Sequence, residues 1–69
     1  MENRIKQFRK EKGITLLELA HLSNVSIGYL SHLEHGGRNN PSFNVMSKIA
    51  NALNKNITDI FLNWIFYKK

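Results

Sequence analysis

The chain has 69 residues, a length that supports one domain with a small hydrophobic core. Ten lysine and arginine residues against five acidic residues give a formal net charge of +5, which favours a polyanionic partner. The chain has no cysteine, and this excludes disulfides and thiolate metal sites.

Histidines are the remaining candidate metal ligands, at His21, His32 and His35. The last two are three residues apart but have no third ligand near them, so we expect solvated or partner-facing histidines, without a metal or other cofactor. Charged residues follow Met1, and the apolar stretch near residues 60–67 is too short to cross a bilayer. We therefore expect a cytoplasmic protein with no membrane segment.

Residues 2–12 have the pattern of a basic helix with one narrow apolar stripe. Ile5 and Phe8 are three residues apart, and most other positions are polar or charged. Gly13 follows, where a glycine commonly ends a helix. We expect a local positive face from the basic residues of this segment, which are Arg4, Lys6, Arg9, Lys10 and Lys12.

Thr15 and Glu18 have the spacing of a capping box, which predicts a helix from Leu16 to about Ser23. Asn24 tolerates the left-handed backbone conformation that a tight turn needs. The helix is therefore expected to end in a short turn.

Ser26 is the next candidate N-cap, and a second short helix is predicted over residues 26–34. Leu30 and Leu33 share one face of this helix, which we expect to be buried. The glycines at 36–37 are expected to end it.

Residues 37–42 have the composition of a loop, and Ser42 is a further N-cap candidate. The next helix is predicted from apolar residues at helical spacing, namely Phe43, Met46, Ile49, Ala50 and Leu53.

Asn56 and Asp59 have the spacing that begins one more helix, which carries Ile57, Ile60 and Phe61. The connections are too short for a linker. The sequence thus predicts a single all-α domain over residues 1–69, built from five compact helices.

The segment 15–34 combines two capped helices with a turn of three to four residues around Asn24, as in a helix-turn-helix. Ala20 is small enough to let the two helices cross closely, and Val25 can fill the turn. The second helix is then held where it can enter the major groove of DNA, about 12 Å wide, with its N-terminal N–H groups towards the duplex.

Five stretches together resemble the lambda-repressor-like, Cro/CI or XRE-type helix-turn-helix domains, and the first of them is especially similar to the SinR-type repressors. They are R-I-K-Q-F-R-K-E-K-G-I-T (4–15), L-E-L-A (17–20), N-V-S-I-G-Y-L-S-H-L-E-H-G (24–36), N-P-S-F (40–43) and K-I-A-N-A-L (48–53). The resemblance implies a five-helix domain that binds double-stranded operator DNA, usually as a homodimer, and acts as a transcriptional regulator, most often a repressor.

The resemblance makes residues 26–34 the recognition helix, with base contacts from Ser26, Ile27, Gly28, Ser31 and His32. His32 can donate to a guanine edge, whereas Ile27 can make only apolar contact, for instance with a thymine methyl group. Gly28 permits close approach of the backbone.

The chain departs from the family where many members have glutamine, because it has Leu16, Ile27 and Gly28 at those positions. We therefore expect a larger share of phosphate contact and shape readout. The expected phosphate contacts are Thr15, Leu16, Tyr29, Arg38, Asn39, Asn40 and Ser42, and Arg4 can add another.

The family positions that match Arg9 and Glu34 form a partly buried ion pair, so the resemblance implies a structural role for both. Lys6 and Lys10 are expected to form a solvated face.

Residues 60–69 carry more aromatic surface than a core of this size can bury. Ile60, Phe61 and Trp64 are expected to face the core. The remaining apolar residues form either a dimer interface, with Leu62, Ile65 and Phe66, or a tail folded over the core. A third reading is an interfacial membrane anchor, because two lysines follow the aromatic residues.

Leu17 and Leu22 make the first motif helix apolar on more than one side; one is expected to pack on the final helix, the other to contact a partner. This surface supports the alternative function of a protein-interaction module, such as an antitoxin or a partner-binding regulator, using Leu16, Leu17 and the aromatic C-terminus. A partner protein that modulates DNA binding is also compatible with it. The sequence has no glycine-rich phosphate loop, paired carboxylates or nucleophile with a base, so we expect no enzyme activity.

Overall fold

The computed structural model describes residues 3–36 and 40–62, and these residues form five α-helices and no strand. The helices are α1 (Ile5–Lys12), α2 (Leu16–Ser23), α3 (Ile27–Glu34), α4 (Phe43–Leu53) and α5 (Ile57–Ile60). The predicted five-helix, all-α architecture is confirmed.

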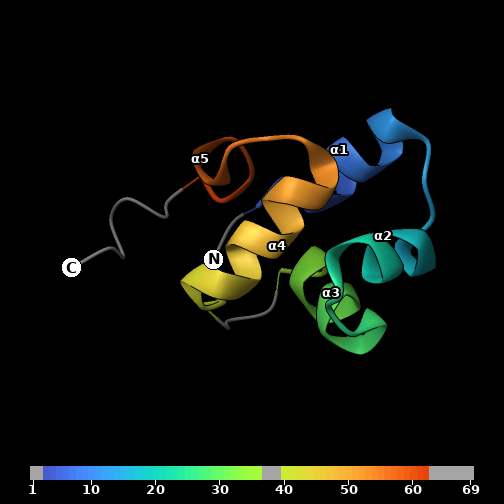
Figure 1. The fold of residues 1–69 in the computed structure, drawn as a ribbon, viewed down its shortest axis with the longest axis horizontal. Helices are drawn as coiled ribbons and strands as arrows, with labels where there is room; N and C mark the ends of the chain where they lie inside the picture. Colours follow the sequence, from blue (N-terminus) through green and yellow to red (C-terminus); the bar gives the residue numbers. More distant parts are fainter. Residues whose placement is uncertain (1–2, 37–39, 63–69) are drawn as a thin grey trace.

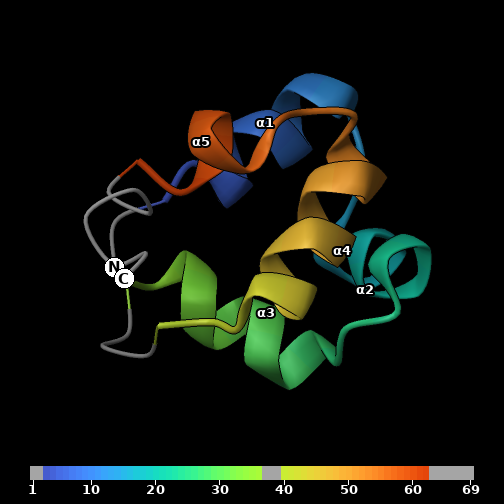
Figure 2. The same ribbon diagram turned by 60° about the vertical axis from the view of Figure 1, so that its left-hand side comes forward.

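Helix α4 lies at the centre of the fold and packs against α1, α2 and α5 (Figure 1). Helix α3 packs against α2 and α1, at the opposite side of the molecule from the end of α1 (Figure 2). The backbone N–H of Arg4 donates to the carbonyl oxygen of Ile60 at 2.7 Å, which joins the start of α1 to α5.

Helices α2, α3 and α4 begin where local capping signals predict. Helix α1 instead begins at Ile5, later than the predicted start at residue 2, and Arg4 before it supplies no side-chain cap. The Thr15 hydroxyl accepts from the Glu18 backbone N–H at 3.0 Å, and the Glu18 carboxylate accepts from the Thr15 N–H at 2.8 Å. Asn24 ends α2 in the left-handed conformation, with φ of 58°. These contacts satisfy helix-end groups that would otherwise lack partners.

The hydrophobic core draws on all five helices. The side chains buried almost completely are Ile5, Leu19, Leu30, Ile49, Ile60 and Phe61. Val25 is buried as well and fills the turn between α2 and α3, as predicted.

The prediction that Leu17 or Leu22 packs on the final helix is wrong, because 65% of Leu17 and 57% of Leu22 is exposed. The buried stripe of α2 runs through Leu19 and Ser23. Helical periodicity places Leu17 on the face of α2 nearly opposite that stripe and Leu22 beside the stripe, so neither reaches the core. Phe43, the first residue of α4, is also largely exposed despite its place in the apolar pattern.

An ion pair joins α1 to the end of α3. The Arg9 Nε donates to Glu34 Oε2 at 2.7 Å, and Nη2 donates to Oε1 at 3.3 Å. The Arg9 Nη1 also donates to the carbonyl oxygen of Ile14 at 2.9 Å. The side chains are only 13% and 6% exposed, and the hydrogen bond to Glu34 raises the pKa of Arg9 above its ordinary value.

We predict that Glu34→Ala lowers the free energy of unfolding by about 3–5 kcal/mol, because it leaves the Arg9 guanidinium poorly solvated and without its carboxylate. Chemical denaturation measures this change. Glu11→Ala is the matched control, since Glu11 accepts only an exposed hydrogen bond from Gln7, and it should change stability by less than about 0.5 kcal/mol. Equal effects of the two substitutions would contradict the structural role of the pair.

Candidate nucleic-acid interface

The turn between α2 and α3 has a defined geometry. The backbone N–H of Val25 donates to the carbonyl oxygen of Ala20 at 3.3 Å, immediately after the left-handed Asn24. The Ser26 hydroxyl then accepts from the Tyr29 N–H at 3.2 Å and begins α3. Because both helix ends are capped within a few residues, the angle between the helices is restricted.

One side of α3 is buried and the opposite side is open. Leu30 and Leu33 point into the core. Of the five residues predicted to contact bases, four are exposed and Ser31 is partly buried; the exposed ones are Ser26, Ile27, Gly28 and His32. Most of the face predicted for base contact is therefore open in the described part of the chain.

The residues predicted to contact phosphate lie mainly at helix starts. Thr15 caps α2 and Ser42 caps α4, where the Ser42 hydroxyl accepts from the Val45 N–H at 3.2 Å. Thr15 and Ser42 are exposed, so the N–H groups in the first turns of α2 and α4 that have no partner within the helix can bind an anion. Asn40, in the loop before α4, is exposed as well.

Two other predicted phosphate contacts, Leu16 and Tyr29, are half-buried and pack against the core. Arg38 and Asn39 lie outside the described residues.

The proposed dimer contacts are only partly described. Leu62 is exposed, whereas Ile65 and Phe66, like Trp64, lie outside the described residues.

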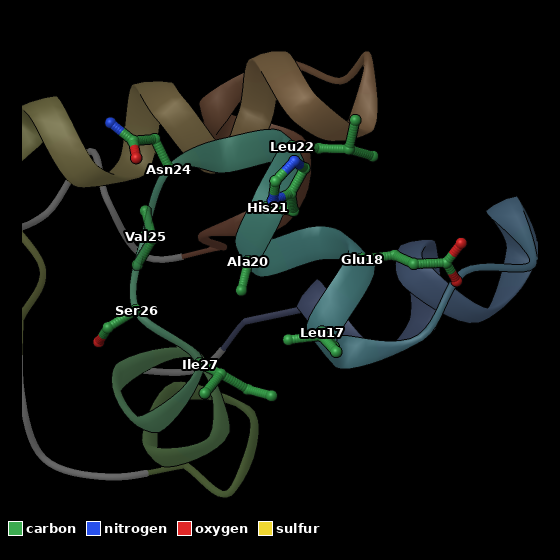
Figure 3. A pocket seen from close by; sticks show the side chains of 9 residues that line it. All are labelled: Leu17, Glu18, Ala20, His21, Leu22, Asn24, Val25, Ser26 and Ile27. Carbon is green, nitrogen blue, oxygen red and sulfur yellow. The ribbon is translucent and has the colours of Figure 1, made fainter.

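A groove of about 800 Å³ runs between α2 and α3 on the outer side of the turn (Figure 3). It is lined by Leu17, Glu18, Ala20, His21, Leu22, Asn24, Val25, Ser26 and Ile27. Leu17 from α2 and Ile27 from α3 project towards the same end of this groove (Figure 3). Sequence patterns did not reveal this pairing, because it depends on the angle of the turn.

The described residues contain no group of three His, Cys, Asp or Glu side chains that could hold a metal ion. Within the same residues, none of the helices has the length and apolar character needed to span a membrane.

Comparison with known proteins assigns a family to this arrangement. The family model for helix-turn-helix domains matches residues 5–60. The transcriptional regulator SinR of Bacillus subtilis is 43% identical over 54 residues, which are 78% of this chain and 49% of SinR. The immunity repressor of Bacillus phage phi105 is 39% identical over 57 residues, which are 83% of this chain and 39% of the repressor.

The crystal structure of the clp gene regulator ClgR from C. glutamicum is similar to this fold, with a TM-score of 0.72 and 37% sequence identity. The match covers 94% of this chain and 83% of the ClgR chain. By contrast, this chain spans only about half the length of SinR. The shared fold, the open face of α3 and these matches agree with the resemblance found in the sequence, and the chain belongs to the XRE-type helix-turn-helix family.

Proposed function

We propose that this chain binds duplex DNA at specific sites and regulates transcription, most simply as a repressor that occupies an operator. The observation that carries the proposal is the open face of α3 opposite the buried Leu30 and Leu33. A helix held in this way can lie in a major groove while the starts of α2 and α4 approach the phosphates.

The charge of the chain supports the same partner. A formal net charge of +5 attracts a polyanion and speeds its encounter with the protein. Helix α3 itself carries only one acidic residue, Glu34, and that carboxylate is paired with Arg9. No unpaired carboxylate of α3 therefore repels the DNA backbone.

We assign different roles to the polar residues of the surface. Ser31 and His32 supply hydrogen bonds to base edges, while Thr15, Ser42 and Arg38 hold phosphates. The proposal includes no catalytic step, since the named relatives are transcriptional regulators and a repressor. The activity belongs in the cytoplasm, where bacterial and phage operators are found.

We further propose that the chain binds as a homodimer, on a palindromic site with half-sites about one helical turn apart. The segment 60–69 is the proposed interface. Leu62 supports it as an exposed apolar residue directly after the buried Phe61.

We predict that selection from a random duplex pool recovers a defined site, bound about 10³-fold or more tightly than random DNA. With about six phosphate contacts, the affinity should fall by about 10³ between 50 and 200 mM salt. A fluorescence anisotropy titration at several salt concentrations measures both quantities. Failure to retain any duplex at low salt would instead favour the protein-interaction module built on Leu16, Leu17 and the aromatic C-terminus.

We predict that Ser31→Ala and His32→Ala relax sequence preference, at a cost of about 1–3 kcal/mol on the selected site and little on random duplex. Arg38→Ala should weaken binding to all duplexes about equally. Lys12→Gln is the matched control for a lost charge, because exposed Lys12 ends α1 on the side away from α3 (Figures 1 and 2). A uniform loss from all three interface variants would contradict the division of roles.

A further inference from the structure

The start of the recognition helix is apolar where most of its open face is polar. Ile27 is the first residue of α3 and is 45% exposed. Leu17 on α2 is 65% exposed and projects towards the same end of the groove (Figure 3). Two branched aliphatic side chains thus line one end of the groove, at the edge of the surface that the proposed function places against DNA. Exposed apolar surface of this kind gains free energy when a partner covers it.

Gly28, the next residue, is not required by the fold. A Cβ built at Gly28 meets no heavy atom within 4 Å, and its φ lies outside the left-handed region. Glycine also weakens a helix relative to alanine. Gly28 therefore brings no visible advantage to the stability of the free protein. Its advantage lies in a complex, where the missing side chain lets a partner approach the backbone closely.

The chemistry of the major groove narrows what Ile27 can recognise. Base edges there present hydrogen-bond donors and acceptors, and the apolar group they offer is the methyl group on C5 of thymine. A 5-methylcytosine carries the same group at the same position. A side chain without polar atoms can discriminate bases only through such a group or through steric exclusion.

We propose that Ile27 reads the C5 methyl group of a pyrimidine in the operator, with Gly28 permitting the approach and Leu17 flanking the contact. This inference rests on the proposed function and commits the apolar end of the groove to DNA. Two features support this occupant: the patch is continuous with the open face of α3, and the net charge of the chain is +5. Ile27 then contributes specificity where the family commonly uses glutamine.

The test replaces each thymine of a selected half-site with deoxyuridine, which removes only the methyl group. The wild-type protein should lose about fourfold in affinity at the position under Ile27. Ile27→Ala should bind the thymine and uracil duplexes equally. Leu22→Ala is the matched control, because Leu22 is an aliphatic residue of the same groove that points away from Ile27, and it should keep the wild-type discrimination (Figure 3).

A second arm separates the methyl group from the rest of the A·T pair. A C·G pair at the same position should bind more tightly when its cytosine carries a 5-methyl group, and Ile27→Ala should remove that gain. Gly28→Ala should melt no lower than the wild type, since its new Cβ occupies open space, but should bind the site several-fold more weakly.

The outcomes distinguish this inference from the function beneath it. Specific binding with no difference between thymine and uracil at any position overturns the methyl contact and leaves the proposed function intact. Discrimination that survives in Ile27→Ala assigns the methyl contact to another residue and also overturns it. Unchanged affinity in Gly28→Ala overturns the close approach. Absence of any specific duplex binding overturns the proposed function, and this inference with it.

Discussion

The whole arrangement depends on holding an eight-residue helix with one side buried and the other side open. A helix as short as α3 is not stable alone in water, so its position has to come from tertiary contacts. Leu30 and Leu33 supply the apolar part, and the bond between Glu34 and Arg9 fixes its last turn to α1. Asn3 adds a side-chain hydrogen bond to the carbonyl oxygen of Leu33 at 2.9 Å. The residues of α3 that make these contacts are not among those assigned to base contact, so stability and recognition use separate residues.

Because stability and recognition use separate residues, the fold tolerates residues on the open face of α3 that lower its stability. Gly28 weakens the helix, and Ile27 exposes apolar surface to water, yet neither disturbs the buried side. A chain of 69 residues has little stability to spare, and Ile27 and Gly28 lie on the face that the proposed function places against DNA. Capping offsets part of the loss, because the Ser26 hydroxyl satisfies the Tyr29 N–H at the start of the same helix.

The starts of α2, α3 and α4 were predictable from sequence because capping is local, whereas α1 has no side-chain cap at its N-cap residue and its start was predicted too early. At each of the three capped starts a hydroxyl accepts a hydrogen bond from the backbone N–H three residues later in the chain. The three hydroxyls belong to Thr15, Ser26 and Ser42. The places of Leu17 and Leu22 were not predictable in the same way, because the four leucines of α2 lie on several of its faces and the sequence alone does not show which face is buried. Their exposure follows from periodicity only once Leu19 is known to be buried. The Arg9–Glu34 pair came from the family resemblance, as its partners are 25 residues apart. The groove between α2 and α3 depends on the angle of the turn, which no single residue encodes.

Few side chains of α3 can hydrogen-bond to base edges, and this number bears on how many protein chains a specific DNA site requires. Ser31 and His32, the two residues assigned to base edges, discriminate by about 1–3 kcal/mol each, and one covered methyl group adds about 0.8 kcal/mol. A single copy therefore reaches about 3–7 kcal/mol, the lower part of the roughly 4–10 kcal/mol that separates specific from non-specific binding. Two copies on a palindromic site double the sum and reach the upper part of that range. The composition of the recognition helix thus supports the proposed homodimer as the more selective form.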